Sequence, residues 1–518
     1  MNHPRTLGPI ARRLALWGLV ALALLTPTPA SAGPEGQLTW GVHLSLVTRW
    51  LDPGEMEGIL TPFLFYYALH DALVKPMPGH AMAPSLAESW TMGKDALSYD
   101  FVLRKGVRFH NGDPVTAEDV KFTFERYKGA GGKLLREKVR EVQVVDPGRV
   151  RFHLREPWPD FMTFYGTSAT GAGWIVPKKY VDRVGEDGFK KAPVGAGPYR
   201  FVSFTPGVEL VLEAFEGYWR KTPSVKRLVL RAMPEETTRA AALKKGEVDI
   251  VYLLSGPVAE EIRRTPGLRL VAPLVAGVFW LDFPDQWDPK SPWHEPRVRL
   301  AASLAIDRQA VNAAETLGFS QPTGSIVPRS FEFALPFDPP RYDPKRAKQL
   351  LAEAGYPDGF DAGDFHPFPP YFSMGEALAG YLQAVGIRTR IKTMERAAFQ
   401  TAWREKTLHG VLLGITGASG NAATRLEGYV TKTGIYAYGV LPEVEDLFHR
   451  QARELDRKKR GALLHQIQKV VHDHVLHAPI YQLAFLCGIG PRVAESGMGL
   501  MPGFAYSAPY EDLTLRTP

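Results

Sequence analysis

The chain has 518 residues, of which 45% are hydrophobic and 23% are charged, a balance typical of soluble globular proteins. This length predicts two or three domains, and the composition argues against wholesale disorder. The net charge of +7 comes from basic residues scattered among acids rather than gathered in a patch, which argues against nucleic-acid binding.

The N-terminus has the pattern of a secretory leader. Arg5, Arg12 and Arg13 precede the apolar run 14–25, and the small-residue site Ala30-Ser31-Ala32 follows it. We expect cleavage after Ala32 and a mature chain that begins at Gly33, with Sec and twin-arginine export both left open. No later run reaches the length of a membrane span. The only cysteine, Cys487, is too far from the cleavage site to carry a lipid anchor and has no disulfide partner.

Short strand-like runs then alternate with amphipathic helical stretches, which predicts α/β lobes. The predicted strands are 107–109, 150–154 and 208–212, and the predicted helices are 237–245, 343–354 and 455–474. Asp343 is a suitable N-cap, Pro344 suits the first helical position, and Gly355 suits the end of that helix. Two segments, 192–199 and 279–283, are candidate crossings between lobes.

Features that suggest an enzyme are weak. His472, His474 and His477 are close in sequence, but residues two apart on a helix point in nearly opposite directions, so a shared metal is not expected. The chain has neither a Gly-x-Ser-x-Gly elbow nor a Walker A loop. A metal-dependent hydrolase that uses these histidines is therefore the least favoured alternative, and no cofactor or metal is expected.

A series of motifs resembles one known family in order and spacing. The segments are 86–90 (LAESW), 99–112 (YDFVLRKGVRFHNG), 114–120 (PVTAEDV), 193–199 (PVGAGPY), 245–249 (KGEVD), 297–299 with 305–308, 342–344 with 350–356, and 382–387. They resemble the large substrate-binding proteins of ABC importers, family 5, which serve dipeptide, oligopeptide and nickel importers. Local chemistry indicates that these motifs are scaffold: Asn111-Gly112 predicts a tight turn, and Thr116 with Asp119 predicts a capping box.

The resemblance implies a two-lobed periplasmic binding protein of the large, cluster C type, with an extra subdomain in lobe I and a hinge between the lobes. The expected divisions are a leader at 1–32, a lobe I core at 33–66, 200–277 and 481–518, an inserted subdomain at 67–199, and lobe II at 278–480. Hinge strands are expected at 279–283 and 479–483. The ligand would be enclosed when the lobes close.

One loop departs from the peptide-binding pattern of the family. In peptide-binding members a Trp is followed three residues later by an Asp whose carboxylate holds the peptide ammonium. The corresponding loop here is 414–425, where Ile415 takes the Trp position and Ala418 the Asp position. No acid occurs between Gly410 and Leu426. A buried ammonium would be left without a partner, so simple peptides are expected to bind poorly.

We expect the ligand to contact aromatic side chains and the polar residues of this loop, because enclosed sites are mostly apolar with a few placed polar groups. The candidates are Trp280, Trp287, Trp403, Ser419, Asn421 and Arg425. Arg425 has an open alternative, a structural ion pair with Glu427 or another acid.

The sequence thus predicts a periplasmic, non-lipidated and monomeric protein that catalyses nothing. It would deliver a small-molecule ligand to an ABC permease driven by cytoplasmic ATPases. A sensor that presents its ligand to a membrane receptor is the runner-up. The identity of the ligand is left open.

Overall fold

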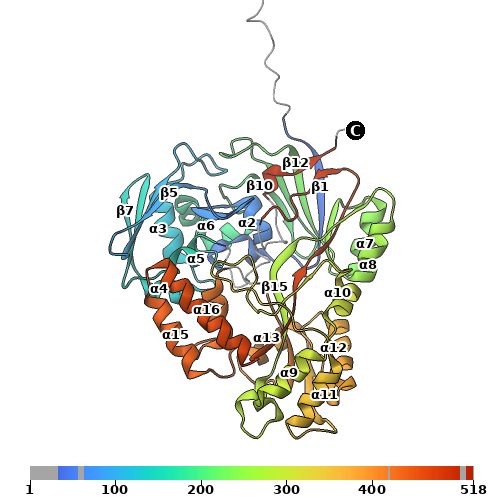
Figure 1. Ribbon diagram of the computed structural model, residues 1–518. Helices are drawn as coiled ribbons and strands as arrows, with labels where there is room; N and C mark the ends of the chain where they lie inside the picture. Colours follow the sequence, from blue (N-terminus) through green and yellow to red (C-terminus); the bar gives the residue numbers. More distant parts are fainter. Residues whose placement is uncertain (1–32, 56–62, 168, 418–419, 502–508, 517–518) are drawn as a thin grey trace, which may run out of the picture.

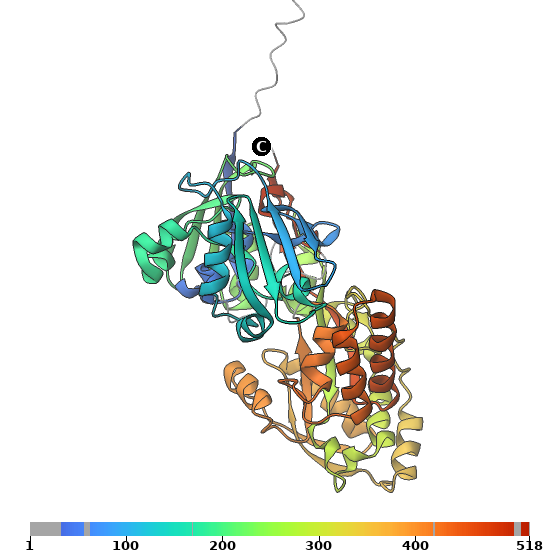
Figure 2. The same ribbon diagram turned by 90° about the vertical axis from the view of Figure 1, so that its left-hand side faces the viewer.

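The computed structural model describes residues 33–55, 63–167, 169–417, 420–501 and 509–516. Two α/β units lie one above the other in Figure 2. We call the elements around the seven-stranded and four-stranded sheets the upper lobe, and those around the six-stranded sheet the lower lobe. Among the described residues no helix is both long and apolar enough to span a membrane.

The main sheet of the upper lobe has β1 (Glu35–Val42) at its centre, paired in parallel with both β12 and β13. Its strands, in spatial order, are β10 (Tyr199–Thr205), β11 (Glu209–Ala214), β12 (Val225–Ala232), β1, β13 (Ile250–Leu254), β21 (Leu486–Ile489) and β14 (Arg269–Val271). Helices α7 (Glu236–Lys245) and α8 (Gly256–Arg264) pack against it. Gly246, at φ 74°, ends α7 in the left-handed conformation that glycine adopts most easily.

The segment 87–154 forms a separate four-stranded sheet with its own hydrophobic core. Its strands, in spatial order, are β5 (Ala87–Met92), β6 (Ser98–Leu103), β8 (Arg149–Leu154) and β7 (Val139–Asp146). The helices between β6 and β10 are α3 (Ala117–Arg126), α4 (Gly132–Lys138), α5 (Phe161–Tyr165) and α6 (Lys178–Lys191). The predicted capping box is present, since the Asp119 carboxylate accepts from the Thr116 amide at 2.9 Å.

Shorter elements complete the upper lobe. They are α2 (Phe63–Leu69), β2 (Asp71–Ala72), β3 (Val74–Met77), β4 (His80–Pro84), β9 (Trp174–Ile175), β22 (Val493–Glu495), β23 (Thr514–Leu515), and the 3₁₀ turns Thr48–Leu51, Pro53–Glu55 and Tyr510–Asp512. The predicted strand 107–109 is wrong: only Arg108 forms an isolated bridge, to Pro114. The turn at Asn111-Gly112, with Gly112 at φ 89°, folds the chain back so that 107–109 faces 113–115. The bridge partner Pro114 has no amide hydrogen with which to extend a ladder.

The lower lobe is a mixed sheet covered by helices. Its strands, in spatial order, are β16 (Gln321–Pro322), β20 (His477–Ala484), β15 (Leu274–Asp282), β19 (Val411–Thr416), β17 (Phe360–His366) and β18 (Ile387–Ile391). The helices are α9 (Pro296–Leu304), α10 (Arg308–Thr316), α11 (Pro344–Glu353), α12 (Phe372–Ala384), α13 (Arg396–Arg404), α14 (Ala422–Val430), α15 (Pro442–Arg453) and α16 (Arg457–Asp473), with 3₁₀ turns at Pro284–Trp287 and Pro292–His294. As predicted, Asp343 caps α11 by accepting from the Arg346 amide at 2.8 Å.

Two antiparallel neighbours, β15 and β20, connect the lobes (Figure 1). β15 spans the expected boundary at 277/278 and β20 the one at 480/481, and β20 leads directly into β21 of the upper sheet. The segment 192–199 lies elsewhere, between α6 and β10, so it joins two parts of the upper lobe. A Cβ on Gly195 would lie 1.9 Å from the Leu69 carbonyl oxygen, so this segment needs glycine for close packing.

Candidate ligand site at the junction of the lobes

The loop that departs from the peptide pattern begins where β19 leaves the sheet beside β15. Trp280 pairs with Gly414 in that ladder, and a Cβ on Gly414 would lie 2.8 Å from the Trp280 ring. Ala418 and Ser419 lie outside the described residues, so the expected contact from Ser419 stays a prediction. The loop ends at Asn421, which caps α14: its Oδ1 accepts from the Thr424 amide at 3.1 Å.

Arg425, one turn into α14, is buried and uses its guanidinium on the main chain. It donates to the carbonyl of Ile326 at 2.7 Å and to that of Ala276 at 2.9 Å. Its guanidinium also lies 5.2 Å from the centre of the Phe331 ring. Burial lowers its pKa to about 10. These contacts connect α14 to β15 and to the loop before α11. The role of Arg425 here is structural, but through hydrogen bonds to carbonyl oxygens rather than through the ion pair with an acid that the sequence suggested.

Two of the predicted tryptophans come together in an aromatic cluster of the lower lobe. The ring centres of Trp280 and Tyr429 are 5.0 Å apart, and those of Trp403 and Tyr436 are 4.6 Å apart. The ring centres of the two indoles are 6.3 Å apart. Both indoles are buried, and neither Nε1 has a hydrogen-bond partner among the described residues. In this conformation the pair is part of the core that supports the loop.

Trp287 is only half-buried and lies against the chain at Gly439, where an added Cβ would come within 2.3 Å of the indole. It shares a cavity of about 10 Å³, the size of a single water site, with Tyr429, Tyr436 and other residues of the lower lobe. Trp287 therefore borders the same aromatic cluster from the other side.

A group of cationic side chains at the junction had no local signal in the sequence. His43 follows β1 in the upper lobe, and its ring meets Tyr252 edge-on at 5.2 Å. Its pKa is lowered to about 3, first by burial and then by the charges of Arg239 on α7 and Arg396 on α13. Arg239 is buried in the upper lobe, where its guanidinium donates to the carbonyl oxygens of Met233, Pro234 and Leu253. Arg396 is exposed on the lower lobe, so one charge from each lobe helps to lower the pKa of His43.

Asn421 also reaches across the junction. Its Nδ2 donates to the carboxylate of Asp160 at 2.8 Å and to the hydroxyl of Thr163 at 3.2 Å, and both partners belong to the upper lobe. The amide predicted to contact the ligand thus serves two roles here, as a helix cap and as a bridge between the lobes.

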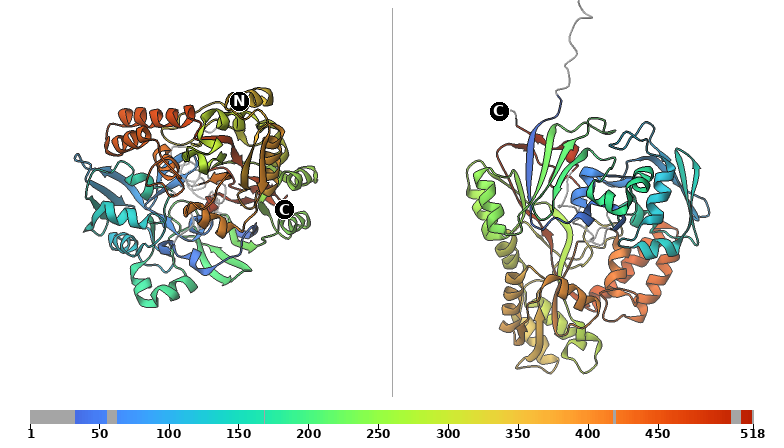
Figure 3. Two further views of the ribbon diagram at one scale, coloured as in Figure 1. Left: turned by 90° about the horizontal axis from the view of Figure 1, so that it is seen from below. Right: turned by 180° about the vertical axis from the view of Figure 1, so that it is seen from behind.

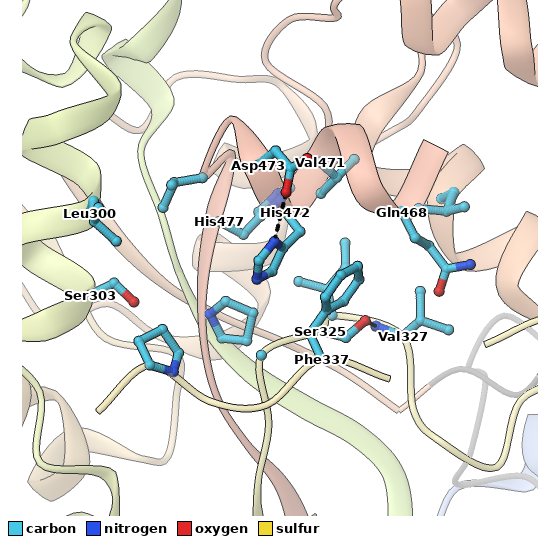
Figure 4. Close-up of a pocket in the computed structure, with 16 residues that line it drawn as sticks. Leu300, Ser303, Ser325, Val327, Phe337, Gln468, Val471, His472, Asp473 and His477 are labelled. Atoms are coloured by element: carbon cyan, nitrogen blue, oxygen red, sulfur yellow. Dashed lines mark hydrogen bonds and ion pairs between the residues drawn. The ribbon is translucent and has the colours of Figure 1, made fainter. Parts of the chain in front are cut away.

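A cavity of about 430 Å³ lies within the lower lobe, between α9, α16, β20 and the loop before α11 (Figure 4). His472 stacks on Phe337 at 4.1 Å, and its Nδ1 lies 3.1 Å from an Asp473 oxygen. Within the described ranges no three His, Cys, Asp or Glu side chains are grouped as metal ligands. None of the described residues predicted to contact the ligand lines this cavity, although Ile326 and Leu426 in its wall adjoin Arg425.

Comparison with known proteins gives a consistent result across sequence and structure. Residues 81–437 match the family described as "Bacterial extracellular solute-binding proteins, family 5 Middle". Heme-binding protein A of Haemophilus influenzae is 27% identical over 449 residues, covering 79% of this chain and 80% of that protein. The glutathione-binding protein GsiB of Salmonella typhimurium is 30% identical over 318 residues, covering 60% of each chain.

Solved structures share the architecture. The periplasmic binding protein DppA from Helicobacter pylori, in complex with peptide STSA, superposes with a TM-score of 0.75 at 24% identity, covering 93% of this chain and 98% of that one. This likeness confirms the predicted fold: two α/β lobes of the periplasmic binding protein type.

Proposed function

Because this chain belongs to family 5 of the bacterial extracellular solute-binding proteins, we propose that it captures a small solute between its two lobes and delivers it to an ABC permease with cytoplasmic ATPases. Members of this family are binding components of importers rather than enzymes, as the sequence predicted. The observation that carries the proposal is the family match over 81–437, which includes both β15 and the loop after β19.

The mechanism follows from the connection between the lobes. In the described part of the chain only β15 and β20 lead from one main sheet to the other, so small dihedral changes where these strands leave the lower sheet would swing one lobe against the other. We assign the lobe I core to 33–66, 200–277 and 481–518, the insertion to 67–199, and lobe II to 278–480. A monomer is sufficient for this cycle.

For the solute we propose a neutral polar or anionic organic molecule. The loop 414–425 offers no carboxylate, while the charges of Arg239 and Arg396 converge on a neutral His43. A free α-ammonium would find no acid within this loop, and the charge of Arg396 would repel it. The relatives are named for ligands as different as heme and glutathione, so membership of the family does not fix the solute.

Native mass spectrometry of protein isolated from its source tests the capture directly, because a closed binding protein retains its solute. We expect one small molecule per chain. Calorimetry with a di- and tripeptide library tests the ligand class. Submicromolar binding that depends on a free α-amino group would contradict it.

We further propose that the protein works in the periplasm after cleavage between Ala32 and Gly33. N-terminal sequencing of the periplasmic fraction should begin at Gly33. An intact Met1 on the bulk of the protein would contradict this proposal.

A further inference from the structure

One buried ion pair joins the two lobes far from the strands that connect them. Asp160 immediately precedes α5 in the inserted subdomain, and Arg460 lies in the first turn of α16 in the lower lobe. In Figure 1, and in the view from behind in Figure 3, the cyan helices of the inserted subdomain lie above the orange-red helices α15 and α16. The two residues are 300 positions apart in the chain.

The geometry of this pair is that of a strong, water-poor contact. One terminal nitrogen of Arg460 lies 2.7 Å and 2.6 Å from the two oxygens of Asp160. The side chains are only 6% and 12% exposed. Arg460 Nε donates to Gln451 at 3.0 Å, and the guanidinium lies 5.4 Å from the Phe333 ring.

Asp160 also contacts the loop 414–425, called the ligand loop below, through Asn421. Asp160 Oδ1, one of the two oxygens that Arg460 contacts, accepts a hydrogen bond from Asn421 Nδ2 at 2.8 Å. The loop 414–425 passes into α14 at Asn421, which caps that helix. A carboxylate of one lobe therefore fixes the position of the cap residue in the other. This contact exists only while the lobes are together.

The ion pair joins one lobe to the other rather than two elements of the same lobe. The Asp160 side chain makes no capping hydrogen bond to α5, and the polar side chains that contact its carboxylate, Asn421 and Arg460, both come from the lower lobe. Opening the lobes would return both charges to water. Truncating one partner of such a pair leaves the other buried and unpaired, which penalises the closed state.

We propose that Asp160 and Arg460 form a latch for lobe closure, and that Asp160 is a positioning residue for the ligand loop through Asn421. This inference rests on the proposed function for its purpose, but the latch itself is testable without a ligand. Ligand contact at the loop and closure of the lobes are then coupled at Asn421, because both require the same loop geometry.

Distance measurement between spin labels on the two lobes is the test. Labels at Lys133→Cys on α4 and Lys469→Cys on α16 occupy exposed positions, and the native Cys487 is buried. We expect Asp160→Asn and Arg460→Met each to lower the ratio of closed to open molecules by about tenfold or more. The exchanged pair, Asp160→Arg with Arg460→Asp, should regain part of the closed population.

Arg457→Gln is the matched control, because Arg457 lies on the same helix and pairs with Glu332 within the lower lobe at the surface. It should leave the distances unchanged. Unaltered distances in both Asp160→Asn and Arg460→Met, with thermal unfolding like that of the parent, would overturn the latch. Failure of the parent protein to retain any solute would instead overturn the proposed function. The two outcomes are distinguishable because the distances are measured without a solute.

Discussion

Asp282 and His477 face each other inside the lower lobe, with the Oδ1 of Asp282 3.9 Å from the Nε2 of His477. Burial raises the pKa of Asp282 to about 7, against the opposing effect of a hydrogen bond from the Phe283 amide. Burial, followed by the charge of Arg299, lowers the pKa of His477 to about 3. Near neutral pH the imidazole is therefore uncharged, and the carboxyl is close to its midpoint.

The first prediction concerns Asp282→Asn. Because the folded pKa of Asp282 lies above the unfolded one, its stabilising effect is complete below about pH 4 and is lost as the pH rises through about 7. Replacement by Asn removes this loss. The difference in free energy of unfolding between variant and parent should therefore shift in favour of the variant by about 2–3 kcal/mol from pH 5 to pH 8. Denaturant unfolding at both pH values measures the difference.

Asp288→Asn is the control for this experiment, since Asp288 is exposed in the loop that follows β15. It removes one acidic side chain as well, so it separates the effect of burial from that of the change in charge. An equal effect of Asp282→Asn at pH 5 and pH 8 would show that the carboxyl is not held protonated by burial.

The second prediction concerns His477, whose contribution to stability depends on pH in the opposite direction. The folded pKa of His477 lies below that of the unfolded chain, so the stability conferred by the neutral ring is present above about pH 6.5 and is lost as the pH falls toward about 3. His477→Gln, which cannot be protonated, should therefore compare more favourably with the parent at pH 5 than at pH 8. Calorimetric unfolding temperatures at the two pH values test this, and a comparison that favours the variant more at pH 8 would refute it.

The third prediction separates structure from binding at Arg425. Arg425→Ala removes the donors from the Ile326 and Ala276 carbonyls and leaves a cavity, so the free energy of unfolding should fall by about 2–5 kcal/mol. The affinity of the remaining folded protein for its retained solute should change little. A variant with normal stability and weakened binding would instead place the guanidinium on the ligand.

A fourth prediction uses the only cysteine. Cys487 lies in β21 and is fully buried, and burial raises the pKa of its thiol. A thiol reagent should therefore not label the native protein at pH 8, and one label per chain should appear on unfolding in denaturant. Rapid labelling under native conditions would mean that β21 leaves the sheet readily.

Local chemistry in the sequence was sufficient for several elements. The caps at Thr116 and Asp343 and the turn at Asn111-Gly112 depend on neighbours within a few residues, and the structure confirms all three. Family motifs gave the order of the remaining parts. The predicted strand 107–109 shows the limit, because its composition suits a strand but its pairing across the turn is a single bridge, from Arg108 to Pro114.

The site was harder to predict, because its contacts join distant segments. The expected residues Trp280 and Trp403 do come together, but they do so in the core, where the indoles support β19 and its loop. Asp160 and Arg460 meet across 300 positions, and neither has a sequence context that marks it. Burial decided these roles, and burial depends on how the lobes pack rather than on any local pattern.

The last prediction concerns the charge at the junction. Arg396 is exposed at the start of α13, and its charge helps to lower the pKa of the half-buried His43 of the other lobe. Arg396→Gln should leave the unfolding temperature nearly unchanged and should weaken the binding of an anionic solute by about two- to fivefold, the range of a solvent-screened charge contact.

The control is Arg404→Gln, at the other end of the same helix. It makes the same change in net charge and should have no effect on binding. Calorimetry at low and high salt measures both variants, because the loss caused by Arg396→Gln should shrink as salt screens the charge. Equal losses from the two variants would show that only the overall charge matters, whereas tighter binding by Arg396→Gln would indicate a cationic solute.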